Sequence, residues 1–385
     1  MLGNIMKFTV PLVQVFASCV LAHLARDKIE ALHPNNYDTS SLIFRDVAIL
    51  GGGAASAGDH TNTYKDAATG TTFDYGVQTY LNNSVTRDFF EHFDVAVGPF
   101  SGSAATYKPT DFNTGQPVNF NPSQDVTLWA AQLAKYPWID KTWEVPQPVP
   151  EDLLLPLGTF IKKFKLESIA YFLYLGAEGL STALQQLTVN VMKMVDPAFI
   201  DERTKGRSLW TVRHNNGEVY EKARAELGDD VLLKSSFQLA SRNSTGVMLV
   251  VKTPSGSKLV IARKLLVTAP SVMDVMRPLN LDKRESDIFS RWSCIGYYVI
   301  VLRNTGLPTG FTWLNANSSM ETYNILQLPG MSEIFQSRVP GLFYAWLRSP
   351  TDLSQADVEK STIETIRCLQ AAQNLPANNA WDCRV

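Results

Sequence analysis

The sequence predicts a mixed α/β protein, α+β over its full length, with a parallel-strand domain and a second domain of mixed sheet and helices. Three observations predict this class. Val47–Leu50 is a continuous apolar run that ends in three glycines, which is typical of a buried parallel strand and its turn. A block with helical periodicity follows Pro150, and several β-rich segments come after it.

The composition sets the size and class of the protein. The chain has 385 residues, of which 45% are hydrophobic and 19% charged, so it is globular and long enough for a two-domain enzyme. With 35 basic and 37 acidic residues and no basic stripe, no nucleic-acid surface is indicated. No CxxC motif and no Cys/His spacing suited to zinc occurs, so no metal site is predicted.

The N-terminus predicts a secretory signal peptide over residues 1–25. Lys7 precedes the short apolar run Phe8–Leu24, and the small residues Ala22 and Ala25 offer two equally suitable cleavage sites. A buried or anchoring helix is the alternative. After cleavage no membrane segment is expected, and the mature protein is expected to be secreted.

Sequons and cysteines are consistent with that route. Three N-x-S/T tripeptides begin at Asn82, Asn243 and Asn317, and they predict a glycoprotein. The mature chain keeps three cysteines, for which buried or incidental thiols are the simplest interpretation and a disulfide between Cys368 and Cys383 is an alternative.

The first part of the chain predicts one further strand and two helices. Phe73–Tyr80 is apolar enough for a strand, and Val85–Phe93 carries phenylalanines at helical spacing. Pro99–Pro122 is rich in turn residues and predicts a loop or irregular strand. Ser123 is expected to cap a helix over Val126–Tyr136.

A helical cap and a strand-rich second half follow. Apolar residues recur at three- and four-residue steps in three segments, Leu157–Phe164, Ser168–Leu175 and Leu184–Met194. A helix over Glu218–Leu227 is predicted next. The predicted strands are Val231–Ala240, Gly246–Thr253, Lys258–Ala269, Cys294–Arg303 and Gly341–Leu347, and the last predicted helix is Ser354–Ala372.

The glycine turn after the first strand is a candidate dinucleotide site. Gly51-x-Gly53-x-x-Ser56 keeps two of the three glycines of G-x-G-x-x-G, in which glycines allow a tight turn and close approach to a pyrophosphate. A purely structural glycine turn is the alternative.

The stretch that follows resembles the flavin-containing amine oxidase superfamily, in particular fungal secreted enzymes similar to β-cyclopiazonate dehydrogenase. The sequence GDHTNTYKDAATGTTFDYGVQTYLN resembles that family's turn beside the pyrophosphate and its Asp-x-Gly turn beneath the flavin ring. NNGEVYEKARAELGDDVLLKSSF and ARKLLVTAP resemble the segments that re-enter the cofactor domain, and the strand's Phe237 is expected to meet the adenine through its backbone. LNLDKRESDIFSRW and YYVIVLRNTGLP resemble the entry to the substrate domain.

The resemblance implies FAD as cofactor and a Rossmann-like FAD-binding domain. It carries over as cofactor-binding residues Gly51, Gly53, Ala54, Ser56, Gly58, Asp59, His60, Thr61, Gly76, Val77, Gln78, Phe237, Thr268 and Ala269. It implies a signal peptide over 1–25, the FAD-binding domain over 40–98 and 205–275, the substrate and cap domain over 99–204 and 276–372, and an irregular tail over 373–385.

The chain departs from the family pattern after Gly53. A βαβ unit needs roughly 30 residues, and its ribose-binding acid lies about 20 residues past the glycines. Between Gly53 and Gly58 neither a helix nor a second strand fits, so the FAD-binding domain is predicted to be incomplete. A gene-model error, a splice form and a real deletion are the alternatives. The last residues also lack the family's final Thr-Gly turn and helix, so the chain is expected to be truncated there.

The predicted function is that of an amine-oxidase-like FAD-dependent oxidoreductase. It would oxidise a small organic or secondary-metabolite substrate by hydride transfer to flavin, and no protein acid or base is singled out because such chemistry need not use one. The alternative is a catalytically impaired homologue that binds a small molecule or nothing. Four aromatic residues are weighed as lining a substrate pocket or as plain core, namely Trp313, Tyr323, Tyr344 and Trp346.

Overall fold

The structure is a computed structural model that describes residues 30–51, 61–99, 106–123, 125–317, 322–375 and 382–384. The predicted signal peptide lies outside these residues. By its contacts the chain forms two compact units, each described by itself below: unit 1 contains residues of 1–56 and 226–293, and unit 2 residues of 57–225 and 294–385. The boundaries of the FAD-binding and substrate domains stay a prediction. The mixed α/β fold class is confirmed.

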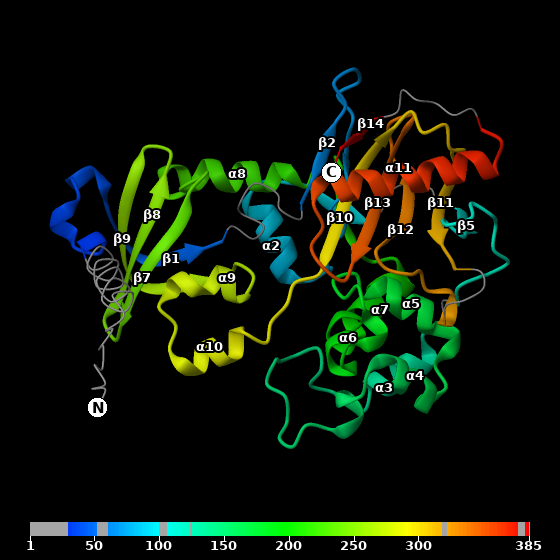
Figure 1. Cartoon of the computed structure of the whole chain (residues 1–385), viewed down its shortest axis with the longest axis horizontal. Coiled ribbons are helices and arrows are strands. Elements are labelled where there is room, and N and C mark those ends of the chain that lie inside the picture. The colour runs from blue at the N-terminus through cyan, green and yellow to red at the C-terminus, as the bar shows by residue number, and fades with distance from the viewer. Residues whose placement is uncertain are drawn as a thin grey trace, which may run out of the picture. The chain divides into compact units, whose positions relative to one another are not determined.

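Unit 1 is built on a four-stranded sheet with strand order β1-β9-β8-β7 (Figure 1). β1 runs parallel to β9, and the other neighbours are antiparallel. The strands are β1 (Leu42–Leu50), β7 (Ser236–Asn243), β8 (Gly246–Thr253) and β9 (Gly256–Val267).

Local side-chain chemistry fixes the β7–β8 hairpin. The Asn243 side-chain oxygen accepts hydrogen bonds from the backbone N–H groups of Thr245 (2.8 Å) and Gly246 (3.1 Å). Gly246 has φ +159, and a Cβ there would lie 2.5 Å from the Ala262 carbonyl oxygen, so only glycine allows this close approach.

Two short helices, α9 (Met273–Met276) and α10 (Lys283–Phe289), follow β9. Asp282 and Glu285 form a reciprocal capping box at the start of α10, and Arg242 of β7 pairs with Glu285. Burial of Met276 and Leu279 with apolar side chains of the sheet forms the core of this unit.

β1 is the exposed part of unit 1. Among the described residues it pairs with β9 only, and it is the edge strand of the sheet. Val47, Ile49 and Leu266 stay 48%, 60% and 51% exposed, and Ile49 and Leu266 are cross-strand partners. The strand expected over Val47–Leu50 is present and runs parallel to β9, but Val47 and Ile49 are exposed, so the expectation that this strand is buried is wrong for them.

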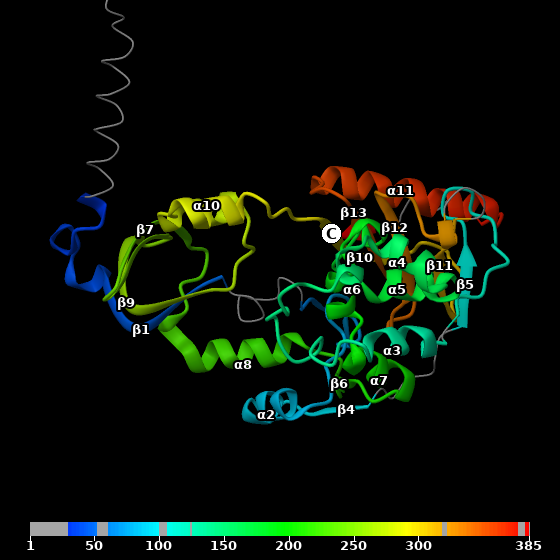
Figure 2. The ribbon, with the colours of Figure 1, turned by 90° about the horizontal axis from the view of Figure 1, so that it is seen from below.

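Unit 2 is built on a six-stranded sheet with strand order β14-β10-β13-β12-β11-β5. The long helix α11 (Gln355–Ala372) lies along one face of this sheet (Figures 1 and 2). The strands are β5 (Thr106–Thr110), β10 (Gly296–Arg303), β11 (Phe311–Asn315), β12 (Gly330–Gln336), β13 (Leu342–Ser349) and β14 (Asp382–Arg384).

Alternation along the strands determines which side chains face α11. Ile300, Phe343 and Ala345 pack with Ile366 and Leu369 of the helix in one buried cluster. Ser354 caps α11, because its hydroxyl accepts a hydrogen bond from the Asp357 N–H. The residues between these strand positions point to the opposite face.

The predicted helical cap is present and has its own core. Trp129, Phe160, Leu173 and Val191 belong to one buried apolar cluster. Its helices are α3 (Thr127–Leu133), α4 (Leu157–Phe164), α5 (Ala170–Gly176), α6 (Thr188–Met194) and α7 (Pro197–Lys205). The prediction that Ser123 caps α3 is wrong. The Ser123 hydroxyl accepts a hydrogen bond from the Asp125 N–H, and the Asp125 carboxylate accepts one from the Thr127 N–H.

The remaining described elements of unit 2 form two small sheets and two helices. Phe73–Tyr80 is a strand only at its start; the chain then turns at residues 75–76 and runs irregularly to Tyr80, which forms an isolated β-bridge with Leu209. The elements are β2 (Thr63–Lys65), β3 (Thr72–Asp74), β4 (Val97–Pro99), β6 (Leu209–Thr211), α2 (Ser84–His92) and α8 (Gly217–Leu227), of which α8 continues past Ala225 by two residues that belong to unit 1.

The alternative of a disulfide between Cys368 and Cys383 can be compared with the structure. Cys368 is a free thiol that donates to the Asn113 carbonyl at 3.2 Å, so it forms no disulfide; the side chain of Cys383 lies outside the described part. In the described ranges, no helix has the length and apolar character needed to cross a membrane, and no group of His, Cys, Asp and Glu suits a metal ion.

Candidate functional site

Three predicted cofactor residues meet at the carboxyl ends of β1 and β9 in unit 1. Gly51 has φ +94, and a Cβ there would lie 2.7 Å from the Ala269 nitrogen. The Thr268 hydroxyl donates to the carbonyls of Leu50 (3.2 Å) and Gly51 (3.0 Å). Glycine is therefore required at position 51, and the carboxyl edge of parallel strands is where α/β folds bind ligands.

Phe237 does not join these residues. It lies in β7, at the far edge of the sheet from β1, beside a bulge in its pairing with β8. Phe237 pairs with Val251 of β8, and Val251 pairs with Lys258 near the start of β9. Thr268, in contrast, follows the end of β9. At about 3.3 Å per residue this separation along β9 is roughly 30 Å. The predicted contact of Phe237 with the adenine stays a prediction.

Six predicted cofactor residues lie outside the described part of the chain. They are Gly53, Ala54, Ser56, Gly58, Asp59 and His60.

The other predicted residues lie in unit 2, around the turn that follows β3. Asp74 is only 6% exposed, and its carboxylate accepts hydrogen bonds from the Thr63 hydroxyl and from the Asn216 N–H (2.8 Å). The Asn216 side chain donates to the Val77 carbonyl at 2.7 Å, and Gln78 donates to the Asp74 carbonyl at 3.2 Å. These bonds fix the backbone of Gly76, Val77 and Gln78, while Thr61 lies buried beside β2.

The Asp74 carboxyl is electrostatically unusual. Burial, which outweighs the hydrogen bonds from Thr63 and Asn216, raises its pKa from 3.8 to about 6. Its second oxygen, Oδ2, is buried without a hydrogen-bond partner. The turn therefore contains an acid that holds a proton far more readily than an ordinary aspartate.

The turn is fastened to the large sheet of unit 2. The indole N–H of Trp346 donates to the Tyr75 carbonyl at 3.1 Å, and Phe73 stacks on Tyr344 at 5.9 Å between ring centroids. Tyr344 and Trp346 alternate on β13, so both lie on the sheet face opposite α11.

This face carries a cluster of aromatic side chains. Phe335 stacks on Tyr344 with centroids 4.8 Å apart and lies 4.5 Å from Trp346, and Tyr297 lies 6.1 Å from Trp346. All four remain partly exposed. We call them the aromatic face. Of the four predicted pocket aromatics, Trp313 is instead fully buried and Tyr323 packs against the cap core, so neither is on this face.

A charged group continues the same face toward the cap. Arg348, 0% exposed, is the next outward residue of β13, and it pairs across the sheet with Tyr297. Its guanidinium donates to the carbonyls of Tyr174 (2.9 Å) and Leu175 (3.4 Å) in the last turn of α5. Glu333, 6% exposed, lies 4.0 Å from it. Sequence reasoning missed this group, although the alternation Tyr344-x-Trp346-x-Arg348 signals it.

Burial dominates the electrostatics there. It raises the pKa of Glu333 from 4.5 to about 7, although Arg348 acts in the opposite direction. Glu178, which follows α5 and is exposed, interacts electrostatically with Arg348. The hydroxyls of Tyr174 and Tyr297 and the Nε of Arg348 are buried without a partner.

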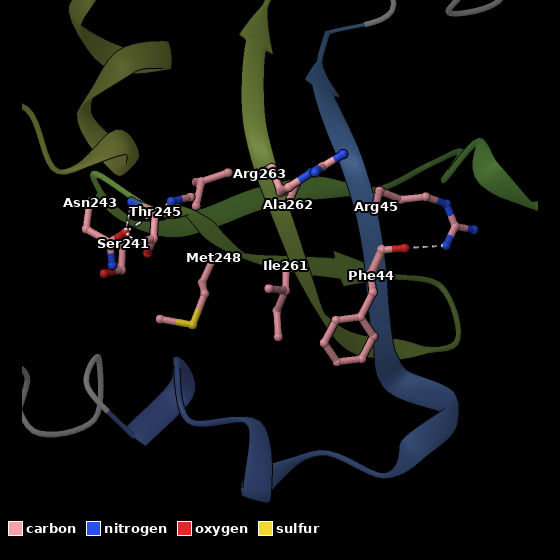
Figure 3. Close-up of a pocket in the computed structure, with 11 residues that line it drawn as sticks. Phe44, Arg45, Ser241, Asn243, Thr245, Met248, Ile261, Ala262 and Arg263 are labelled. Atoms are coloured by element: carbon pink, nitrogen blue, oxygen red, sulfur yellow. Dashed lines mark hydrogen bonds between the residues drawn. The ribbon is translucent and has the colours of Figure 1, made fainter.

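A separate pocket lies on the sheet of unit 1. Figure 3 shows Met248, Ile261 and Phe44 pointing to the same side of three neighbouring strands, in a pocket of about 320 Å³. Its two arginines are paired, Arg45 with Asp230 and Arg263 with Asp46. It contains none of the predicted cofactor residues.

The chain is similar to several curated fungal proteins, although no model of a known protein family matches it. It is 36% identical to the FAD-dependent oxidoreductase pigF of Monascus ruber, with 89% of this chain and 79% of that protein aligned. It is 34% identical to the FAD-dependent oxidoreductase oblC of Cochliobolus heterostrophus over 93% and 82% of the two chains. Beta-cyclopiazonate dehydrogenase of Aspergillus oryzae is 26% identical over 88% and 79%.

Solved structures show the same fold at low identity. The fatty acid isomerase of P. acnes that produces CLA matches with a TM-score of 0.63 at 17% identity, over 84% of this chain and 82% of that chain. A triple mutant of putrescine oxidase matches with 0.59 at 14%, over 89% and 84%. Cyclohexylamine oxidase from Brevibacterium oxydans matches with 0.56 at 16%, over 88% and 84%.

These similarities agree with the family-like sequence motifs that lie in both units. Relatives above 30% identity are aligned over most of both chains. The chain therefore belongs to the family represented by these fungal FAD-dependent oxidoreductases, with FAD as its cofactor and the fold of the flavin amine oxidases.

Proposed function

We propose that this oxidoreductase removes a hydride from a small organic molecule, such as a secondary metabolite, that lies on the aromatic face of unit 2. The observation that carries the proposal is the link between that face and the turn at Gly76–Gln78: Trp346 donates to Tyr75, and Tyr344 stacks on Phe73. A substrate resting on these rings would be held next to the turn that resembles the family's turn beneath the flavin.

The described residues around this turn suit the flavin-ring end of FAD. The backbone of Gly76, Val77 and Gln78 is held in place by Asn216 and Asp74, and the unpartnered Asp74 Oδ2 leaves a polar atom for a ligand or water. Bound FAD would supply the hydride acceptor. The protein's own part is to bind and orient the substrate on Phe335, Tyr344 and Trp346 and to exclude water from it.

The pyrophosphate end is less complete. Gly51, Thr268 and Ala269 would border it in unit 1, whereas the other predicted residues of that end lie outside the described part of the chain. Only residues 51–62 separate β1 from β2, fewer than the roughly 30 residues of a complete βαβ unit, whose helix N-terminus normally binds the pyrophosphate.

That observation favours the second candidate function, a homologue with impaired cofactor binding. The exposure of Val47 and Ile49 on β1 supports it, because this is the surface that a following helix would cover. The two candidates differ in FAD affinity. A dissociation constant in the nanomolar to low micromolar range supports an active enzyme, and a millimolar constant supports the impaired homologue.

The test of the proposed reaction is anaerobic. The protein reconstituted with FAD is mixed with a panel of flat aromatic alcohols, amines and partly saturated ring compounds, and loss of the visible flavin band is followed. A substrate should bleach the band, and admission of air should restore it with release of peroxide. Trp346→Phe removes the hydrogen bond to Tyr75 and should slow bleaching. Trp292→Phe, a change at an exposed tryptophan of unit 1, is the control.

We further propose that the protein is a secreted glycoprotein, on the strength of the signal-like residues 1–25. Asn243 is exposed at a hairpin, which suits an attached glycan, whereas Asn317 is only 9% exposed, which does not. Mass spectrometry of the protein from the medium of a fungal host, before and after enzymatic deglycosylation, tests both points. A glycan at Asn243 and a new N-terminus near residue 25 are expected.

A further inference from the structure

Four buried side chains of unit 2 form a cluster whose hydrogen-bonding capacity is not used within the protein. The cluster consists of Tyr174, Tyr297, Glu333 and Arg348, and we call it the donor cluster. It lies where the aromatic face meets the cap, because Arg348 follows Trp346 by two residues on β13 and bonds the end of α5. Tyr174 lies 4.4 Å and Tyr297 5.9 Å from the Arg348 guanidinium, measured to the ring centroids.

Within the part of the chain that the structure describes, three polar groups of this cluster have no hydrogen-bond partner. They are the Tyr174 hydroxyl, the Tyr297 hydroxyl and the Arg348 Nε–H, and each is buried. An unmade buried hydrogen bond costs about 1–3 kcal/mol, so three in one place are a large penalty. Native interiors avoid such groups unless a ligand or ordered water satisfies them.

The chemistry of the three groups limits the ligand. The Arg348 Nε–H can only donate, and its other guanidinium nitrogens already bond the Tyr174 and Leu175 carbonyls. Both tyrosine hydroxyls can donate as well. A ligand atom that satisfies all three must therefore be an acceptor, and an oxygen is the acceptor that suits N–H and O–H donors.

The surrounding charges disfavour a cationic ligand. Two acidic residues, Glu333 and Glu178, interact electrostatically here with two basic residues, Arg348 and Arg203. Glu333 has a raised pKa of about 7 and is partly protonated at neutral pH, so it offers no firm anion for an ammonium group. The adjoining Phe335, Tyr344 and Trp346 offer a surface for a flat conjugated body.

We infer that the donor cluster anchors a carbonyl or phenolic oxygen of a flat conjugated substrate whose body stacks on the aromatic face. This deepens the proposed function, because it names the substrate class of that same face, and it rests on that function only for the reaction that follows binding. Binding itself requires neither turnover nor bound FAD.

The test is calorimetric titration of the purified protein with two matched probes. 2-Acetyl-1-naphthol carries both oxygens, and 2-ethylnaphthalene has the same shape without them. The naphthol should bind at least tenfold more tightly to the wild-type protein. Equal affinities, or tighter binding of 1-naphthylmethylamine than of the naphthol, would overturn the inference.

Two variants remove only the unpartnered hydroxyls. Tyr174→Phe and Tyr297→Phe should each weaken naphthol binding about tenfold, which corresponds to about 1.4 kcal/mol, and should leave the hydrocarbon's affinity unchanged. Each variant should melt at the same temperature as the wild type or higher, because it deletes a buried hydroxyl that has no partner.

Tyr298→Phe is the matched control. Tyr298 is the next residue on β10, and its hydroxyl donates to Asp352 at 2.7 Å and accepts from the Leu353 N–H. Its loss should lower the melting temperature and leave naphthol binding intact. If Tyr174→Phe and Tyr297→Phe instead behave like Tyr298→Phe, the hydroxyls have a structural role and the inference fails. If they behave as expected and no flavin is bound, only the proposed reaction fails.

Discussion

Replacing Asp74 by Asn is expected to stabilise the protein at neutral pH and to remove part of its pH dependence. Asp74 is buried at the turn after β3, where one carboxylate oxygen accepts two hydrogen bonds and the other accepts none. The amide of Asn keeps the accepting oxygen and has no charge to desolvate. The variant therefore resembles the protonated wild-type side chain.

The magnitude follows from the pKa. Folding raises the pKa of Asp74 from 3.8 to about 6, so the folded state binds the proton more tightly than the unfolded state. This contribution is fully present below pH 3.8 and is lost as the pH rises through 6. A difference of about two pKa units corresponds to about 3 kcal/mol, which is the most that Asp74→Asn can restore at pH 7.5.

The assay is urea unfolding at pH 5 and pH 7.5, with Asp66→Asn as control. Asp66 lies in the same hairpin, but its pKa is lowered, mainly by hydrogen bonds from Thr69 and to a smaller extent by the charge of Arg303. Asp66→Asn should therefore destabilise the protein at pH 7.5. The reasoning is refuted if Asp74→Asn is less stable than the wild type at pH 7.5, or if its gain is the same at pH 5.

Three further outcomes are expected. Ile49→Thr, at a 60% exposed position on β1, should change the free energy of unfolding by less than about 0.5 kcal/mol and lower aggregation in light scattering; a large loss would show that the face is covered. Ser354→Ala should cost about 1 kcal/mol in chemical denaturation by removing the cap of α11, and no loss would contradict the capping role. Arg348→Met should cost about 3–5 kcal/mol by leaving Glu333 and the α5 carbonyls unpaired, and a neutral result would contradict that pairing.

Long periodic elements could be predicted from the sequence. The helix at Leu157–Phe164 and the strand at Gly246–Thr253 have the expected bounds, because each combines a clear apolar period with a clear stop. β11 lies outside the predicted strands, and β5 lies within Pro99–Pro122, which was predicted only as a loop or irregular strand. Both are short and pair in parallel with each other across a long stretch of chain, so no local pattern marks them.

The candidate site could be predicted only in part. The turn at Gly76–Gln78 was located by resemblance, but the bonds that fix it come from Asn216, which lies 139 residues from Val77 in sequence. The donor cluster could not be located, because Tyr297 meets Arg348 only through the register of β10 and β13, and Tyr174 through the docking of α5. Register and docking are set by tertiary packing, which a single sequence does not display.

The measurement that tests the account most directly is the visible absorbance spectrum of the purified protein, before and after denaturation. The account predicts a protein-bound flavin band near one FAD per chain, either as purified or after incubation with FAD. The turn after β3 would then hold the cofactor although only residues 51–62 separate β1 from β2. The absence of a bound flavin band, even with FAD in excess, would contradict the assignment of this chain as a working FAD-dependent oxidoreductase.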